Sequence, residues 1–324
     1  MTSALNPSTS NPSALGPVSQ LVNGILSIKP LAQLAKSRAR SMMIKRAELI
    51  GVYWPQEVAQ LRSRGGQADL SPEWEAELAA VTNPAVVYPD YYLQSFHAYE
   101  EGNLGWEPAM EVEVAAYAVH SRVWSKQEIA DGDARLRESY HTLLKAALPN
   151  PPKDILDLGC SVGMSTFALQ QVFPDAQLLG LDLSPYFLAI AQYQTPRKHP
   201  AGSPAPRWIH AAAEQTGLPD ASVDLVSTHL LFHELPQSAA IAILQEARRV
   251  LRPGGHLAIM DMNPQSDIYA QMPPYILTLL KSTEPCLDDY FNLDLAQAIY
   301  DAGFTRPTIT SNTPRHRTVI AQVR

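Results

Sequence analysis

The feature of this 324-residue chain that most constrains its fold is a short apolar segment followed by a glycine-containing turn. Residues 154–158 predict a buried strand with Asp157 near its tip. Gly159 and Gly163 then punctuate a turn before a helix that should begin near Ser161. In an open parallel sheet, the turn after the first strand lies at the carboxyl edge, where ligands bind. Free N–H groups at the start of the helix would receive an anion, either a pyrophosphate or an amino-acid carboxylate.

From this turn to the end of the chain, strand and helix patterns alternate as in βαβ units. The helices are expected near residues 162–173, 185–194, 237–251 and 293–302. The strands are expected near residues 154–158, 177–182, 207–211, 223–229, 256–262, 307–311 and 317–323. The turn between the last two strands is too short for a parallel crossover, so this pair should be antiparallel. The sequence therefore predicts an α/β fold with a Rossmann-like, mostly parallel seven-stranded sheet, its last strand antiparallel, plus a helical N-terminal extension.

Composition divides the chain before the sheet into two parts. Residues 1–19 contain little besides Ser, Pro, Asn, Thr and Ala, which cannot bury enough apolar surface to fold, so a disordered tail is predicted. Residues 20–134 are interpreted as a helical N-terminal extension and lid, and residues 135–324 as the domain that contains the sheet.

The overall composition excludes several classes of protein. The net charge of −7 argues against a general nucleic-acid-binding protein. Two cysteines, Cys160 and Cys286, cannot form a disulfide framework and fit a reducing compartment, so a cytoplasmic location is expected. The sequence has neither a run of about 18 apolar residues, as a membrane-spanning helix needs, nor the pattern of a signal peptide.

The segment from residue 20 to residue 50 is basic and has apolar residues at helical spacing. Its cations are Lys29, Lys36, Arg38, Arg40, Lys45 and Arg46. One interpretation is a helix that packs on its own domain with a solvated basic face, as most amphipathic helices in soluble proteins do. The other is peripheral contact with an anionic membrane or a lipophilic partner.

Two aromatic-rich segments are candidates for the walls of a pocket. The first runs from residue 88 to residue 106 and combines aromatic residues with His, Glu and Asn, as a lid over a ligand would need. The second is the apolar insert at residues 263–292. Tyr99, Trp106 and Tyr275 are the predicted substrate-binding residues. The alternative is that these side chains only cover an apolar edge or fill the core.

The glycine turn does not match the dinucleotide fingerprint Gly-x-Gly-x-x-Gly, because Ser161 stands where its second glycine would be. The second predicted strand nevertheless ends at Asp182, 19 residues after Gly163. A carboxylate there is well placed to accept hydrogen bonds from a ribose diol. It could also simply cap the helix that begins at residues 184–185.

At this point the sequence resembles a known family, the class I S-adenosylmethionine-dependent methyltransferases, and within it the ubiquinone/menaquinone-methyltransferase-like group. The resemblance covers roughly residues 135–324 and rests on five segments in the right order. They are Asp157-Leu158-Gly159-Cys160-Ser161-Val162-Gly163, Gly180-Leu181-Asp182-Leu183-Ser184, Ala213-Glu214 with residues 218–226, Phe232-His233-Glu234-Leu235, and residues 246–255 ending in Pro253-Gly254-Gly255.

The resemblance implies that the cofactor is S-adenosyl-L-methionine. Its carboxylate would meet the helix after the turn, its ribose would meet Asp182, and the apolar face of its adenine would meet Leu183. Ala212 stands where the family often has an Asp for the adenine, which leaves this contact to backbone groups or to Glu214. The full set of implied cofactor-binding residues is Asp157, Gly159, Cys160, Ser161, Gly163, Asp182, Leu183, Ala213, Glu214 and His229.

Two histidines lie at the predicted carboxyl end of the fourth strand, beside the expected methyl group. His233 and His229 are the candidate catalytic residues, since a general base helps when the acceptor is a hydroxyl or an activated carbon. The alternative is a structural histidine that shapes the turn. A zinc-protease motif at His233-Glu234 is excluded, because residue 237 is Gln and Pro236 interrupts the helix, so no metal site is predicted.

Three functions remain open at the level of sequence. The leading one is a methyltransferase that acts on a small, lipophilic or aromatic acceptor by O- or C-methylation. A nicotinamide-dependent Rossmann oxidoreductase and a non-catalytic methyltransferase-like binding protein are the alternatives. The expected partner is a small-molecule acceptor and not a nucleic acid, with peripheral membrane contact through residues 20–50 as an open question. The oligomeric state is not predicted.

Overall fold

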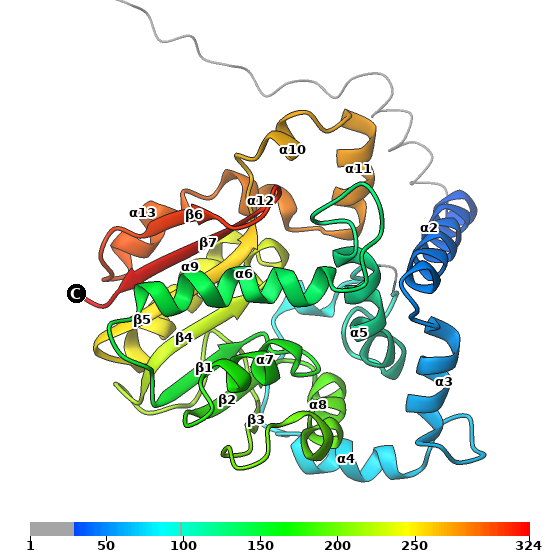
Figure 1. Cartoon of the computed structure of the whole chain (residues 1–324), viewed down its shortest axis with the longest axis horizontal. Helices are drawn as coiled ribbons and strands as arrows, with labels where there is room; N and C mark the ends of the chain where they lie inside the picture. The colour runs from blue at the N-terminus through cyan, green and yellow to red at the C-terminus, as the bar shows by residue number, and fades with distance from the viewer. Residues whose placement is uncertain (1–28, 98) are drawn as a thin grey trace, which may run out of the picture.

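The computed structural model describes residues 29–97 and 99–324, with side chains from residue 37 onward (Figure 1). The predicted disordered tail at residues 1–19 therefore lies outside the described residues. So does the first part of the basic segment, residues 20–28.

The centre of the molecule is a seven-stranded sheet with strand order β3-β2-β1-β4-β5-β7-β6. The strands are β1 (Asp154–Leu158), β2 (Gln177–Asp182), β3 (Arg207–His210), β4 (Val223–His229), β5 (Leu251–Met262), β6 (Thr308–Ser311) and β7 (His316–Gln322). Strands β1 to β5 pair in parallel, whereas β7 is antiparallel to both β5 and β6. The predicted fold class, including the antiparallel last strand, is confirmed.

The fifth strand begins earlier than predicted. Leu251 already pairs with Val223, and the register then shifts before His256 pairs with Leu225. The glycines at 254–255, which interrupt the apolar pattern, therefore lie within β5 at an irregular register rather than before the strand. Such an irregularity fits the rule that glycine inside a strand often marks a bulge.

Helices cover both faces of the sheet, as the two-residue period of the strands requires. On one face, α6 (Gly132–Ala147) and α7 (Met164–Val172) pack through Tyr140 and Leu169 against Ile155. On the other face, α9 (Gln237–Val250) and α13 (Leu295–Asp301) pack against its chain neighbour Leu156. Adjacent residues of β1 therefore serve opposite cores. The helix α8 (Pro185–Lys198) completes the βαβ alternation between β2 and β3.

The N-terminal extension lies on the side to which the parallel strands point (Figure 1). It contains α2 (Lys29–Leu49), α3 (Trp54–Ser63), α4 (Glu73–Val81), the short 3-10 helix η1 (Asp90–Leu93) and α5 (Trp106–His120). Helices α2 and α3 pack on α5 through a small apolar cluster that includes Ala47, Trp54 and Val114. Over its described side chains, α2 is thus a helix packed on its own chain.

The extension shares a core with the sheet domain. Trp74 of α4 is completely buried and packs in one cluster with Ala109 of α5 and Ile190 of α8. The predicted boundary after residue 134 falls inside α6, which begins at Gly132. The insert between β5 and α13 forms α10 (Asp267–Ala270), α11 (Pro274–Thr283) and α12 (Leu287–Asn292). Among the helices that the structure describes, none is long and apolar enough to cross a membrane.

Candidate active site

The turn between β1 and α7 has an unusual backbone that only certain residues tolerate. Gly159 and Gly163 have φ values of +67° and +85°, and between them Ser161 has a φ of +51°. A Cβ atom on Gly159 would lie 2.7 Å from Leu231, and one on Gly163 would lie 2.6 Å from Trp208. Both glycines are therefore needed for close packing as well as for their conformation. Because Ser161 and Gly163 have positive φ, α7 begins at Met164 and not near Ser161 as predicted.

The amides of this turn fasten β1 to β2. The N–H groups of Gly159 and Cys160 both donate to the carbonyl of Leu181, at 2.8 and 3.0 Å. The N–H of Ser161 donates to Oδ2 of Asp182 at 2.8 Å. The amides that a helix leaves without an internal partner are those of its first turn, here beginning at Met164. An anion would meet this first turn, while the predicted Gly159 and Cys160 shape the loop around it.

Asp157 lies fully buried beneath the turn. Its Oδ2 accepts hydrogen bonds from the hydroxyls of Ser165 and Thr166, both at 2.6 Å, which ties the strand to the start of α7. Burial raises the pKa of Asp157 to about 6, although these two hydrogen bonds oppose the shift. Its other oxygen, Oδ1, is buried and accepts no hydrogen bond from any described residue.

Three more buried polar atoms beside this turn have no partner among residues 29–97 and 99–324. They are the hydroxyls of Ser161 and Thr228 and Nε2 of His229. Buried polar atoms in native proteins are nearly always hydrogen-bonded, and leaving one without a partner costs about 1–3 kcal/mol. A ligand with both donors and acceptors at the ends of β1 and β4 would satisfy these atoms.

Asp182 ends β2 and is the second anchor of the site. Its Oδ1 accepts from the N–H of Ser184 at 2.8 Å, and burial raises its pKa to about 6. The cap of α8 is Ser184, whose hydroxyl accepts from the N–H of Phe187, so the capping alternative for Asp182 does not apply. The contact of this carboxylate with a ribose stays a prediction, and its lone pairs are shared with the amides of Ser161 and Ser184 and with Tyr92. Leu183 is buried directly after it.

The predicted adenine side lies after β3. Ala213 is buried there, and Oε1 of Glu214 accepts from the hydroxyl of Tyr91 in η1 at 2.7 Å. The second oxygen, Oε2, is buried with no hydrogen-bond partner in the described part of the chain. One wall of the predicted adenine side is thus the carboxylate of Glu214, whose Oε2 can still accept a hydrogen bond.

The two candidate catalytic histidines have opposite environments. Burial lowers the pKa of His229 well below its ordinary value, which leaves a neutral ring whose Nε2 has no described partner. His233 lies 2.7 Å through Nδ1 from Oδ1 of Asp261 at the end of β5. Burial opposes its charge, but the field and hydrogen bond of Asp261 raise the pKa of His233 to about 10. His233 therefore carries its proton at neutral pH, which supports the structural interpretation of this residue. Its role as a base stays a prediction.

The segment from Asn83 to Gly105 crosses the carboxyl edge of the sheet and is tied down at both ends. At one end the N–H of Asn83 donates to Nδ1 of His210 in β3 at 2.9 Å. At the other end the hydroxyl of Ser184 donates to the carbonyl of Asn103 at 2.6 Å. Between these ties, Tyr92 lies close enough to Asp182 to affect its pKa by a hydrogen bond. This segment, here called the lid, covers the ends of β2 and β3.

The middle of the lid reaches the insert and α5. The N–H of His97 donates to the carbonyl of Thr283 at the end of α11, at 3.0 Å. The hydroxyl of Tyr99 donates to Glu111 of α5 at 2.7 Å. The lid therefore bridges the sheet edge, the insert and the N-terminal helices.

The three predicted substrate-binding residues are not brought together. Tyr99 is in the lid, bonded to Glu111. Trp106 packs in the apolar cluster of the extension, 5.4 Å between ring centroids from Trp74. Tyr275 is 44 % exposed on α11. Their role in substrate binding stays a prediction, and only Tyr99 lies in the lid that crosses the site.

Comparison with known proteins identifies the family to which the chain belongs. A family model described as a methyltransferase domain matches residues 156–259, which run from β1 to β5 and include the turn and Asp182. An uncharacterized methyltransferase of Synechocystis sp. is 31% identical over 169 residues, which cover 52% of this chain and 74% of that protein. The chain belongs to the class I S-adenosylmethionine-dependent methyltransferases. The resemblance inferred from the sequence is confirmed, and the cofactor of this methyltransferase is S-adenosylmethionine.

Other relatives are similar over smaller shares of their length. O-methyltransferase cnsE of Penicillium expansum is 35% identical, over 54% of this chain and 62% of that protein. A demethylmenaquinone methyltransferase of Thermus thermophilus is 34% identical, over 36% of this chain and 51% of that protein. The chain thus spans about half to three fifths of the length of these two relatives.

Among solved structures, a phosphoethanolamine N-methyltransferase of Haemonchus contortus superimposes with a TM-score of 0.50 at 12% identity, covering 68% of this chain and 60% of that one. At this identity the likeness concerns the fold alone. It agrees with the seven-stranded sheet described above.

The methyltransferase contains a functional candidate that the sequence patterns missed. Arg137 of α6 is buried, with Nε 2.9 Å from Oδ2 of Asp133 and Nη2 3.8 Å from the sulfur of Met164, the first residue of α7. The positive charge of Arg137 also acts to lower the pKa of Asp157, which places the guanidinium beside the turn. No motif marks Arg137, because it lies in a helix outside the segments that resemble the family.

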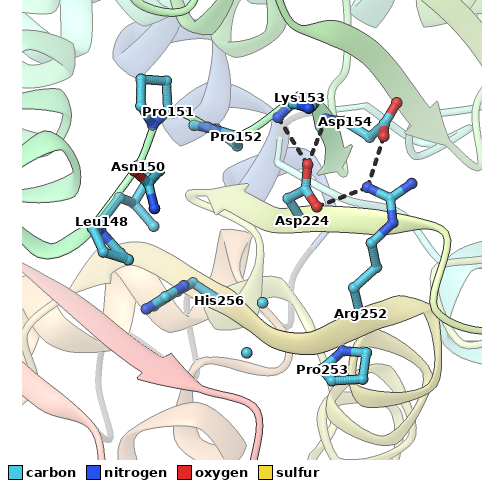
Figure 2. A pocket seen from close by; sticks show the side chains of 13 residues that line it. Leu148, Asn150, Pro151, Pro152, Lys153, Asp154, Asp224, Arg252, Pro253 and His256 are labelled. Atoms are coloured by element: carbon cyan, nitrogen blue, oxygen red, sulfur yellow. Dashed lines mark hydrogen bonds and ion pairs between the residues drawn. The ribbon is translucent and has the colours of Figure 1, made fainter.

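A cavity of about 550 Å³ lies at the opposite edge of the sheet, at the amino ends of β1, β4 and β5 (Figure 2). One of its cations, Arg252, lies 2.7 Å from both Asp154 and Asp224. Asp224 also accepts from the amides of Lys153 and Asp154. The charges of Arg252, Asp154 and Asp224 therefore satisfy one another and clamp the ends of the strands, away from the turn and Asp182.

Proposed function

We propose that this methyltransferase transfers the methyl group of S-adenosylmethionine to a small, lipophilic or aromatic acceptor, by O- or C-methylation. The observation that carries the proposal is a set of unsatisfied buried atoms at the ends of β1 and β4. They are Asp157 Oδ1, Ser161 Oγ, Thr228 Oγ1 and His229 Nε2, and the amide of Ser161 is bonded to Asp182. The donors and acceptors of an amino-acid carboxylate and amine suit such a set. The adjacent lid is rich in tyrosine.

Different residues of this chain would bind the cofactor and position the acceptor. Arg137 and the first turn of α7 would bind the carboxylate of the cofactor, because both present positive charge beside the turn. Asp182 would accept from the ribose, while Ala213 and Glu214 would line the adenine side. The lid would exclude water and position the acceptor. The bound cofactor supplies a sulfonium methyl group that is already activated, so the protein need only align the nucleophile with it.

An aromatic acceptor fits the aromatic side chains near the lid and the insert. Tyr91 packs against the main core beside the insert, and Tyr269 and Phe291 of the insert pack edge to face with 5.3 Å between centroids. These side chains would form apolar walls with polar tips, which small-molecule sites prefer. The nicotinamide-dependent alternative is not favoured, because the turn lacks the dinucleotide fingerprint and the relatives are methyltransferases.

Peripheral membrane contact remains part of the proposal. Four residues at helical spacing lie on the exposed face of α2. Two are the cations Arg38 and Lys45, and two are the apolar residues Met42 and Leu49, whose exposed fractions are 64% and 72%. Such a basic and apolar stripe suits an anionic surface, which supports a protein that works in the cytoplasm and at a membrane.

The experiment that tests the function uses methyl-labelled S-adenosylmethionine with fractionated cell extract, followed by identification of the labelled product. The expected product is a small molecule that partitions into organic solvent. Label found only in protein or nucleic acid would contradict the proposed acceptor class. Calorimetry with S-adenosylmethionine and with NAD, side by side, tests the oxidoreductase alternative, which predicts tighter binding of NAD.

A further inference from the structure

Three buried polar side chains connect the N-terminal extension to the turn after β1. They are His120, the last residue of α5, and Asp133 and Arg137 in the first two turns of α6. None of them lies in residues 156–259, which match the methyltransferase family model. This group is here called the α6 network.

The close packing of α5 against α6 fixes where the network begins. A Cβ atom on Gly132, the first residue of α6, would lie 2.4 Å from the carbonyl oxygen of His120. The indole N–H of Trp124, between the two helices, donates to the carbonyl of Gly132 at 3.3 Å. Because only glycine fits this approach, the backbone brings the end of α5 and the start of α6 together. His120 and Asp133 thereby become neighbours.

Asp133 is bonded to both other members of the network. Its Oδ1 lies 2.7 Å from Nδ1 of His120 and 3.2 Å from Nη2 of Arg137, and its Oδ2 lies 2.9 Å from Nε of Arg137. Burial alone would raise the pKa of Asp133, but the charge of Arg137 and the hydrogen bonds of both partners hold it well below its ordinary value. Asp133 is therefore a charged acceptor, and a bidentate pair of this kind fixes the plane of a guanidinium.

The pairing with Asp133 leaves one edge of the Arg137 guanidinium free. Asp133 occupies the edge formed by Nε and Nη2. Nη2 also lies 3.8 Å from the sulfur of Met164, and since one of its N–H groups already reaches Asp133, this contact uses the other. The edge formed by Nη1 and Nη2 therefore faces the start of α7. In the part of the chain that the structure describes, Nη1 has no hydrogen-bond partner and Asp133 is the only acid that pairs with Arg137.

The free edge of Arg137 lies beside other groups that point to a bound ligand. Met164 is the first residue of α7, and the amides of the first helical turn have no partner within the helix. The next two residues, Ser165 and Thr166, are bonded to Asp157, whose buried Oδ1 has no partner among the described residues. Donors and an acceptor at one turn suit a ligand that carries both a carboxylate and an ammonium group. The methionine end of S-adenosylmethionine carries both.

Resting on the proposed function, we propose that Asp133 is a positioning residue for the cofactor. It holds the guanidinium of Arg137 so that the edge formed by Nη1 and Nη2 pairs with the carboxylate of S-adenosylmethionine, and His120 holds Asp133 in turn. Without Asp133, the long side chain of Arg137 has other rotamers available, and pairing with the carboxylate then costs side-chain entropy. Because His120 belongs to α5, the N-terminal extension becomes part of the cofactor site.

The experiment compares two ligands of the full-length protein by isothermal titration calorimetry. S-adenosylhomocysteine carries the carboxylate, whereas 5′-methylthioadenosine keeps the adenosine and the thioether but lacks the amino-acid end. Asp133→Asn should weaken binding of S-adenosylhomocysteine about tenfold, the equivalent of the lost side-chain order. Binding of 5′-methylthioadenosine should not change, because this ligand does not reach Arg137.

A double-mutant cycle tests whether Asp133 acts through Arg137. Arg137→Lys keeps the positive charge but lacks the paired N–H groups, so it should weaken binding of S-adenosylhomocysteine by roughly 10–100-fold. Adding Asp133→Asn to this variant should change the affinity by less than about threefold, since residues that act as a unit are not additive. Additive losses would overturn the role of Asp133.

The matched control is Asp131→Asn. Asp131 pairs with Arg135 of the same helix at 2.9 Å, with the spacing of Asp133 and Arg137, but both of its side chains are more than half exposed. This variant should bind both ligands as the wild type does. Wild-type affinity of Asp133→Asn for S-adenosylhomocysteine, or equal losses with the two ligands, would overturn the assignment.

A second variant covers the case in which Asp133→Asn does not fold. His120→Phe keeps an aromatic ring but removes the partner of Asp133, so the same selective loss is expected at a smaller size, about threefold. No selective loss in that variant would also overturn the assignment. Failure of the wild type to bind S-adenosylhomocysteine would instead overturn the proposed function.

Discussion

The N–H of Ser161 donates a hydrogen bond to Oδ2 of Asp182 at 2.8 Å, which joins the first turn of the cofactor site to the end of the second strand. Ser161 makes this bond from a left-handed conformation, with a φ of +51°. Non-glycine residues adopt that region at a cost of about 1 kcal/mol or more, and such strain collects at functional sites. Asp182 therefore shapes the turn, and the proposed ribose contact would add a second role.

Replacing Asp182 should weaken cofactor binding strongly. Asp182→Ala removes the acceptor for the amides of Ser161 and Ser184 as well as the proposed contact to the ribose. Hydrogen bonds to a charged group contribute about 1.5–3 kcal/mol, so affinity for S-adenosylhomocysteine should fall roughly 10–100-fold. Isothermal titration calorimetry measures this directly. The control is Asp175→Ala, an exposed residue before β2, which should bind as the wild type does. Equal losses in the two variants would show that Asp182 has no special role.

The ion pair of His233 and Asp261 should make stability depend on pH in the alkaline range. The pKa of His233 is raised to about 10 in the folded protein, against an ordinary value near 6.5. Its contribution is therefore fully present below about pH 6.5 and is lost as the pH rises toward about 10. The difference in unfolding free energy between the wild type and His233→Gln should shrink over that range. Urea denaturation at several pH values gives this difference. A gap that stays constant up to about pH 10 would mean that the ring is not protonated in the folded state.

Much of the sheet was predictable from the sequence because its strands are apolar runs bounded by Gly, Pro and Asp. The strands β1, β2 and β4 have the predicted limits. Local patterns did not predict where the helix after the first turn begins, because a serine at position 161 does not indicate a positive φ. The ribose anchor was inferred from the predicted strand that ends at Asp182, and the adenine side was inferred from the family resemblance. Arg137 has no motif and emerges only when α6 packs beside the turn.

The lid could be suspected from its aromatic composition, but its attachment points could not. The bond from Asn83 to His210 joins residues 127 positions apart, and its partner histidine lies in an unrelated strand. Trp106 shows that aromatic composition also cannot tell a pocket wall from a core. Its aromatic ring fits a pocket wall or a core equally well, and the structure shows it packed against Trp74 and Tyr186. Such choices depend on long-range contacts that periodicity does not contain.

The ion pair of Arg40 and Glu111 should anchor α2 to the rest of the molecule. Glu111 is buried in α5 and is bonded by the guanidinium of Arg40 and by the hydroxyl of Tyr99. Arg40→Ala leaves the carboxylate with one donor, so the unfolding free energy should fall by about 1–3 kcal/mol, less than for a fully buried pair because Arg40 is partly exposed. Urea denaturation tests this. Adding Glu111→Gln should recover part of the loss.

The matched control for Arg40 is Arg38 of the same helix, which is exposed. Arg38→Ala should change the unfolding free energy by no more than about 0.5 kcal/mol, as surface substitutions usually do. If the two alanine variants are equally stable, the pair does not anchor the helix. A disturbed lid in Arg40→Ala would appear as faster hydrogen exchange at Tyr99, because that residue shares Glu111.

Reversing the charge of the exposed face of α2 should weaken binding to anionic vesicles strongly. Arg38 and Lys45 lie on this face with Met42 and Leu49, and none of the four belongs to the apolar cluster that joins α2 to α5. Each basic residue near an anionic surface contributes about 1 kcal/mol, so the double variant Arg38→Glu with Lys45→Glu should lower co-sedimentation with phosphatidylserine vesicles by at least about tenfold. The control pair Lys126→Glu with Arg207→Glu makes the same change in net charge outside α2. Neutral phosphatidylcholine vesicles should bind all three proteins equally weakly. Equal pelleting of the two double variants with anionic vesicles would exclude this face of α2 as a membrane contact.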